Sequence, residues 1–156
     1  ERRYPRDRLS VVGFSTRAYA IENNEIPFLT WDETNPYTNM EEALDLAHGI
    51  LSRQKGFRRQ LFLITDGEPT AHRENGFLFF QFPPHPKTIA VTLKRLRTLS
   101  RSGIAASIFL LSREQERVRF AHRLAESCRG KVFHLRPGGL GRCLLMDYME
   151  KKSKWL

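Results

Sequence analysis

The hydrophobic positions of this chain alternate between short unbroken runs and stretches with helical spacing. The unbroken runs predict strands, and they cover residues 9–15, 18–21, 61–65, 104–111 and 131–135. The helical spacing predicts four helices, over residues 39–55, 88–102, 112–130 and 140–152. This alternation predicts one α/β domain over residues 1–156, with a mostly parallel central sheet and helices on both faces.

Two of the predicted strands are joined by only three residues, Ser15-Thr16-Arg17. Such a short connection suits a hairpin, so we expect strands 9–15 and 18–21 to be antiparallel and to give the sheet one antiparallel edge strand. The helix over residues 39–55 leads instead into the strand at 61–65, which is the order of a right-handed crossover unit.

The segment from Ala71 to Pro86 fits neither pattern. It is rich in phenylalanine and contains three prolines, Pro83, Pro84 and Pro86. Because proline cannot donate a hydrogen bond to a strand ladder, we expect a long irregular loop here. Two interpretations stay open: a functional loop, or a flap whose aromatic side chains cover one side of the sheet.

Asp66 follows the strand at 61–65, at the carboxyl end where open α/β sheets place their sites. Gly67 permits a sharp turn, and Pro69 cannot continue a central strand. A carboxylate held at this edge suits either a metal ligand or a nucleophile. A structural interpretation is equally open, because Asp-Gly is also a common turn pair.

A second turn, Tyr37-Thr38-Asn39, precedes the first predicted helix. Thr38 and Glu41 have the spacing of a capping box, which gives the Thr38 hydroxyl a structural interpretation. Together with Asp66, however, Thr38 offers the hard oxygen donors that magnesium or manganese prefers. Two protein ligands are too few for such an ion, so other oxygens would have to complete the shell. Glu68 either hydrogen-bonds to the groups that bind the ion, without binding the ion itself, or is a solvated turn residue.

These two turns resemble a known family. Residues 61–70 (LFLITDGEPT), preceded by residues 37–44 (YTNMEEAL), resemble the metal-binding loops of von Willebrand factor A (vWA) domains. Residues 7–15 resemble the second strand of that family. Three further stretches resemble bacterial and archaeal members akin to magnesium-chelatase subunits, namely residues 82–89, 101–104 and 140–152. The resemblance covers nearly the whole chain and implies a three-layer, Rossmann-like sandwich.

The resemblance also implies a function. In the family's metal-ion-dependent adhesion site (MIDAS), Thr38 and Asp66 would bind Mg²⁺ or Mn²⁺, and a partner protein would offer an Asp or Glu carboxylate to the ion. The neighbouring residues would contact that partner: Tyr37, Asn39, Gly67 and Glu68. Related members are thought to work with AAA+ ATPases of the MoxR or magnesium-chelatase type, so we expect a non-catalytic interaction domain with such a partner.

One motif of the family is absent. The Asp-x-Ser-x-Ser motif ends the family's first strand, and this chain does not contain it. The chain also begins with Glu1 rather than methionine. We therefore expect a vWA domain that lacks its N-terminal strand and first helix, with a metal site that is incomplete in this chain. The alternatives are a degenerate site and a site that another chain completes.

Length and composition narrow the class of protein. The 156 residues are 40% hydrophobic, which is enough for a core of one globular domain. No apolar run approaches the roughly 20 residues that span a membrane. Cys128 and Cys143 are far apart and lack companions at metal-ligand spacing. This pattern favours two unpaired thiols in a reducing cytoplasm.

The formal net charge of +9 raises nucleic-acid binding as an alternative function. Most of the basic residues fall on the polar faces of predicted helices without interleaved aromatic residues, so we favour solvated helix faces. Phosphoryl transfer with Asp66 as the nucleophile is the other alternative. No second acid follows Asp66 at a suitable position, which argues against the enzyme.

Overall fold

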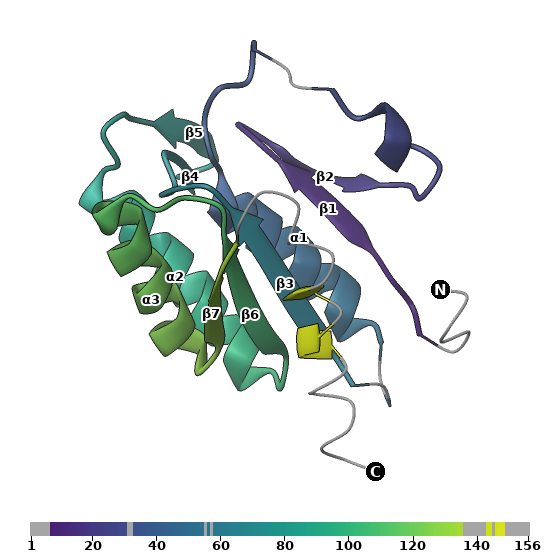
Figure 1. Ribbon diagram of the computed structural model, residues 1–156. Coiled ribbons are helices and arrows are strands. Elements are labelled where there is room, and N and C mark those ends of the chain that lie inside the picture. The colour runs from purple at the N-terminus through teal and green to yellow at the C-terminus, as the bar shows by residue number, and fades with distance from the viewer. Residues whose placement is uncertain are drawn as a thin grey trace. The chain divides into compact units, whose positions relative to one another are not determined.

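The computed structural model describes residues 7–30, 33–54, 56, 58–135, 143–144 and 146–148. Its elements form two compact units. We call residues 1–56 with 69–95 the first unit, and residues 57–68 with 96–156 the second unit. Figure 1 shows the helices and strands of both units.

The first unit begins with a hairpin. Strands β1 (Val11–Phe14) and β2 (Ala18–Ile21) are antiparallel, with Val11 opposite Ile21, as the three-residue connection predicts. A short 3-10 helix, η1 (Ile26–Phe28), follows. Helix α1 (Met40–Ser52) packs against both strands through its apolar face. The buried apolar residues of that face are Met40, Ala43, Leu44 and Ala47.

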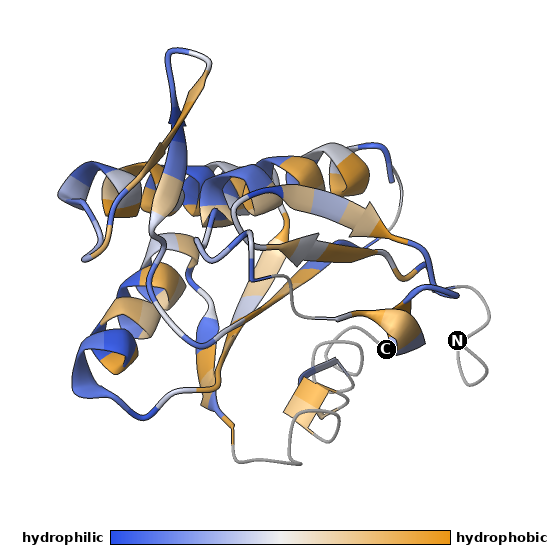
Figure 2. Ribbon diagram, turned by 90° about the horizontal axis from the view of Figure 1, so that it is seen from above, coloured by the Kyte–Doolittle hydropathy of each residue, from blue (hydrophilic) through white to orange (hydrophobic). Residues whose placement is uncertain are grey.

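A second hairpin corrects the expectation of an irregular loop between Ala71 and Pro86. Strands β4 (Ala71–Glu74) and β5 (Phe77–Phe80) are antiparallel and are joined by Asn75-Gly76. Both turn residues have positive φ, 50° and 85°, which is the backbone of the favoured two-residue hairpin turn. The prolines begin only after β5, so they do not interrupt the ladder. Figure 2 shows this hairpin as a hydrophobic strand beside a mainly hydrophilic one.

Helix α2 (Pro86–Arg101) begins in the first unit and ends in the second. Its first residue is a proline, which suits the first helical turn because no intrahelical partner awaits its missing N–H. Leu93 is buried in the first unit, and Leu96 and Leu99 are buried in the second.

The second unit holds a three-stranded parallel sheet in the order β3-β6-β7. The strands are β3 (Gln60–Thr65), β6 (Ala105–Leu110) and β7 (Lys131–His134). Helix α3 (Gln115–Cys128) packs against β6 and β7. At the centre, the Phe109 ring stacks on Phe133 at 4.9 Å and meets the edge of Phe62 at 5.7 Å.

These elements confirm the predicted α/β class with parallel pairing. The antiparallel strands β1 and β2 form a two-stranded sheet of their own. Within the described part of the chain, β3 pairs with β6 along one edge and with no strand along the other. None of the described helices is both long enough and apolar enough to cross a membrane.

The closing helix predicted over residues 140–152 is described only in part. Residues 143–144 and 146–148 are helical, and the rest of that prediction lies outside the described residues. Asp147 is buried, and its Oδ2 accepts a hydrogen bond from Ser107 Oγ of β6 at 2.8 Å. Cys128 and Cys143 are both free thiols.

Two glycines give a matched test of packing in this fold. A Cβ added at Gly130 would lie 2.5 Å from the Ala106 carbonyl oxygen, whereas a Cβ at Gly49 in α1 would meet nothing within 4 Å. We expect Gly130→Ala to lower the free energy of unfolding by about 1–3 kcal/mol. Gly49→Ala should raise it by about 0.5–1 kcal/mol, because alanine favours the helix. Urea unfolding of both variants checks this, and a neutral Gly130→Ala would contradict the packing.

Candidate functional site

The turn before α1 lies in the first unit and is held through its backbone. Thr38 N–H donates to Thr70 Oγ1 at 2.8 Å. The Thr38 carbonyl accepts from the N–H groups of Thr70 and Ala71, at 2.9 and 3.2 Å. Tyr37 stacks on Phe80 of β5 with 4.5 Å between ring centroids. The turn is therefore fixed to the β4–β5 hairpin rather than left as a free loop.

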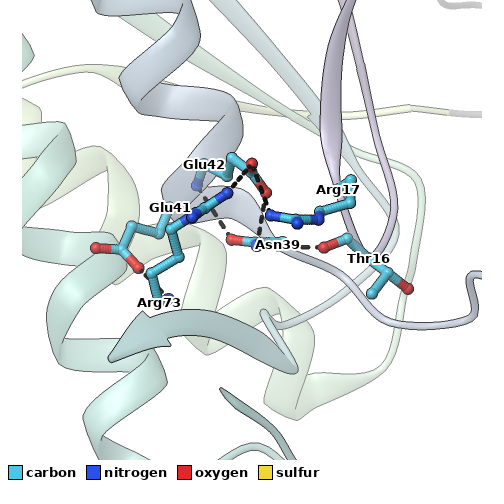
Figure 3. Close-up of polar contacts among 6 residues, drawn as sticks. All are labelled: Thr16, Arg17, Asn39, Glu41, Glu42 and Arg73. Carbon is cyan, nitrogen blue, oxygen red and sulfur yellow. Dashed lines mark hydrogen bonds and ion pairs between the residues drawn. The ribbon is translucent and has the colours of Figure 1, made fainter. Parts of the chain in front are cut away.

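Asn39, not Thr38, caps α1. Its Oδ1 accepts from Glu42 N–H at 3.1 Å, and its Nδ2 donates to Glu42 Oε2 and to the Thr16 carbonyl (Figure 3). Asn39 is fully buried, and its own N–H donates to the Ser15 carbonyl at 2.8 Å. The capping box predicted from Thr38 and Glu41 is therefore wrong by one residue. The Thr38 hydroxyl makes no hydrogen bond to any residue that the structure describes.

The acids beside this turn already have partners. Glu42 Oε1 lies 3.4 Å from Arg17 and 3.0 Å from Arg73. The buried Glu41 carboxylate accepts from Arg73 N–H at 2.8 Å and pairs with Arg95 at 3.4 Å (Figure 3 shows Glu41, Glu42 and Arg73). Arg95 also pairs with Asp45, whose pKa is raised mainly by burial. These carboxylates support the fold of the first unit instead of facing a ligand.

Asp66 lies in the second unit, immediately after β3, and its side chain is exposed. The described residues offer no hydrogen bond or ion pair to its carboxylate. Its carbonyl oxygen accepts from Arg117 Nη1 at 2.8 Å. Thr65 Oγ1 braces the turn by donating to the Gly67 carbonyl at 3.0 Å and accepting from Gly67 N–H at 3.2 Å. The backbone is thus held while the carboxylate stays free.

The role predicted for Gly67 needs correction. Its φ lies outside the left-handed region, and an added Cβ would make only ordinary contact with the Arg117 guanidinium, at 3.5 Å. The turn therefore depends on the Thr65 side chain rather than on glycine flexibility.

Glu68 is half-buried on the same turn. Burial raises its pKa, and the nearby Glu116 carboxylate raises the pKa further. Three arginines of α3 act in the opposite direction: Arg123, Arg117 and Arg119.

The two predicted metal ligands lie in different units, Thr38 in the first and Asp66 in the second. Among the described residues, no group of three or more His, Cys, Asp or Glu side chains is placed so that it could hold a metal ion. A divalent ion at Thr38 and Asp66 therefore stays a prediction, and the side chains present supply one hydroxyl and one carboxylate toward it.

Sequence reasoning missed two positioning residues. Thr70 holds the Thr38 turn, and it stands inside residues 61–70, the stretch that carries the family resemblance. Arg117 holds the Asp66 carbonyl from 51 residues away. Nothing in the sequence distinguishes Arg117 from the other arginines of α3, because only the packing of α3 against β6 and β7 brings it to the turn.

Comparisons with known proteins identify a family that this chain matches. The family described as "Rv0959-like protein, vWA domain" matches residues 1–149. The uncharacterized proteins Rv0959 of Mycobacterium tuberculosis H37Rv and Mb0984 of Mycobacterium bovis are each 33% identical to this chain over 157 residues. The match covers 97% of this chain but only 23% of each relative, so the chain spans about a quarter of their length.

A solved structure shares the fold. The conserved hypothetical protein BatB from Bacteroides thetaiotaomicron matches with a TM-score of 0.61 over 93% of this chain and 78% of that chain. The sequence identity is 15%, so this likeness concerns the fold alone.

The cap at Asn39 and the free hydroxyl at Thr38 predict unequal losses of stability for two neighbouring substitutions. We expect Asn39→Ala to lower the free energy of unfolding by about 2 kcal/mol, because it removes the cap and leaves buried polar groups unpaired. Thr38→Val should change it by less than about 0.5 kcal/mol, because the lost hydroxyl has no partner. Chemical denaturation measures both, and equal losses would contradict the assignment of the cap.

The raised pKa of Glu68 predicts a pH-dependent effect. Because the folded chain holds this proton more tightly than the unfolded chain, stability is lost as pH rises through the range just above the usual glutamate pKa. We expect Glu68→Gln to raise the thermal midpoint near neutral pH and to match the wild type below the usual pKa, where both side chains are neutral. A lower midpoint for Glu68→Gln at neutral pH would show that the ionised carboxylate stabilises the turn.

Proposed function

Because the chain belongs to the vWA domains of Rv0959-like proteins, we propose that it is a metal-dependent protein-interaction domain. In this proposal, Thr38 and Asp66 act as ligands of one Mg²⁺ or Mn²⁺ ion. The ion then serves as the point of attachment for a carboxylate of a partner protein.

One observation carries the proposal: the two predicted ligands are free where their neighbours are not. The Thr38 hydroxyl and the Asp66 carboxylate lack protein partners among the described residues. Asn39, Glu41 and Glu42, which share the Thr38 turn, are all held in the cap and its ion pairs. An oxygen that is not already taken up by an ion pair or a cap can bind an ion, and a fixed backbone holds it in position, which is the state of both turns.

The chemistry of the donors also suits the proposed ion. Mg²⁺ and Mn²⁺ favour oxygen ligands, and an octahedral shell requires more of them than one hydroxyl and one carboxylate provide. We assign the remaining positions to water, to oxygens outside these two turns and to the partner. When bound, the ion supplies a fixed positive charge that a carboxylate can bind directly.

The chain's own residues would shape the contact around the ion. Tyr37 and Glu68 flank the proposed ligands and would touch the partner, while the buried Asn39 would hold the Thr38 turn in place. Gly67 is buried beside the Arg117 side chain, so a partner would meet Arg117 before the Gly67 backbone. This arrangement supports binding rather than catalysis.

The resemblance to magnesium-chelatase-type and MoxR-associated members further suggests an AAA+ ATPase as the partner, with the complex acting in the cytoplasm. Among the described residues, one edge of β3 has no partner strand, so another strand could join the sheet there. In this proposal, that strand would bring the ligand motif that this chain lacks.

Calorimetric titration with Mn²⁺ tests the metal ligands. We expect weak binding to this chain, because two protein ligands leave most of the shell to water. Asp66→Asn should abolish the binding and Thr38→Val should weaken it. Glu33→Gln, at an exposed acid that belongs to neither turn, should leave it unchanged.

Two results would contradict this account. Tight, stoichiometric binding to the wild-type chain would refute the idea that ligands from outside the two turns are needed. Binding that survives Asp66→Asn but is lost in Glu33→Gln would place the ion elsewhere.

A further inference from the structure

The second unit contains an open cavity of about 310 Å³ between the ends of two helices. Six residues from the last turns of α2 and α3 line it: Arg97, Ser100, Arg101, Glu126, Ser127 and Arg129. Ser100 Oγ donates to the Cys128 carbonyl at 3.1 Å, which ties the end of α2 to the end of α3. The walls of the cavity are therefore held together by a direct hydrogen bond.

The cavity lies at the end of the parallel sheet where the strands begin, whereas Asp66 lies at the end where the strands finish. Helix α2 ends just before β6, and α3 ends just before β7, so both helix ends lie at the amino edge. Asp66 follows the carboxyl end of β3. A ligand in this cavity would thus be separate from the proposed metal site.

The charges of the cavity are unbalanced. It contains three guanidinium groups and one carboxylate, Glu126. None of these four side chains forms an ion pair with the residues that the structure describes. At the start of α3, by contrast, Arg117 pairs with the N-cap residue Glu114, and Arg119 pairs with Glu116. The negative ends of the helix dipoles offset part of the repulsion among the three arginines, so a bound anion has to be held by the guanidinium groups against those dipoles.

Arg129 reaches the cavity from a strained backbone position. It caps α3 in the left-handed region, with φ 53° and ψ 35°. Glycine is the residue that this position favours, because a Cβ is unfavourable there. The glycine of this turn stands one residue later, at Gly130, where a Cβ would lie 2.5 Å from the Ala106 carbonyl oxygen. The strained position of Arg129, beside two other arginines without a described ion pair, motivates the hypothesis of a functional role.

We propose that this cavity binds a small anion that carries several phosphate groups. Guanidinium groups bind phosphate oxygens through paired, charge-assisted hydrogen bonds, and Arg97, Arg101 and Arg129 approach the cavity from two different helices. The volume is at the lower end of the range for small-molecule sites, larger than a single phosphate requires. The shared chemistry is a polyphosphate chain, either free or as part of a nucleotide.

Isothermal titration calorimetry of the full chain tests this site, with tripolyphosphate and ATP as separate probes. The buffer holds EDTA at low ionic strength, so that the proposed metal site plays no part and its failure would not affect the result. We expect both probes to bind with one site per chain. Equal affinities would identify the phosphate chain as the ligand, and a preference for ATP would identify a nucleotide.

Matched variants distinguish the cavity from general charge attraction. Arg97→Gln and Arg129→Gly should each weaken tripolyphosphate binding by about tenfold or more, the loss expected for one charge-assisted contact. Arg129→Gly also relieves the left-handed strain, so its thermal midpoint should equal or exceed that of the wild type. Arg113→Gln removes the same charge from an exposed position outside the cavity and should change the affinity less than twofold.

Three outcomes would overturn the proposal. The first is no binding of either probe to the wild-type chain. The second is an equal loss in Arg113→Gln and Arg97→Gln, which would show only nonspecific attraction to a basic protein. The third is full binding by Arg129→Gly together with a lowered thermal midpoint, which would make Arg129 a purely structural residue.

Discussion

The parallel pairing of β3 with β6 is the constraint on which the chemistry of the second unit depends. The ladder runs from Gln60 to Thr65, and the Thr65 carbonyl still accepts a bond from Leu111 N–H at 2.9 Å. Asp66 is therefore the first residue beyond the ladder, and its carboxylate emerges at the carboxyl edge with its backbone already fixed. Because the strands are parallel, the carboxyl ends of α2 and α3 lie at the opposite end of the sheet, and Arg97, Arg101 and Arg129 line the cavity there. One sheet thus separates an acidic turn from a basic cavity.

In the first unit, the corresponding constraint is the buried amide of Asn39. It joins the start of α1 to Glu42 and to the Thr16 carbonyl of the β1–β2 turn. Thr70 then fastens the adjacent Thr38 backbone to the start of β4. These bonds use the backbone of Thr38 and the side chain of Asn39. The Thr38 hydroxyl therefore has no hydrogen-bond partner among the described residues. A free hydroxyl on a rigid backbone is what a metal ligand or a partner contact would use.

The sequence alone predicts the regular parts of this molecule well. Unbroken apolar runs locate β3 and β6, and helical spacing locates α1, α2 and α3, because each pattern follows directly from which faces are buried. The hairpin at 71–80 was missed because the later prolines outweighed Asn75-Gly76, a strong hairpin signal. The predicted cap of α1 is wrong by one residue because Thr38 and Asn39 are both good capping residues. Only the contacts of Asn39 with Thr16 and Ser15 show which of the two caps the helix.

The candidate sites show a similar division. Asp66 can be found from sequence because it follows a buried strand. The arginine cavity cannot, since Arg101 and Arg129 are 28 positions apart and only the contact between the ends of α2 and α3 brings them together. The central claim is that Thr38 and Asp66 bind one ion. Amide NMR spectra recorded during addition of paramagnetic Mn²⁺ test it most directly. We predict that signals of residues 37–39 and 66–68 broaden together and first, and that Asp66→Asn removes the effect. Broadening of only one turn, or of acidic segments elsewhere first, would contradict it.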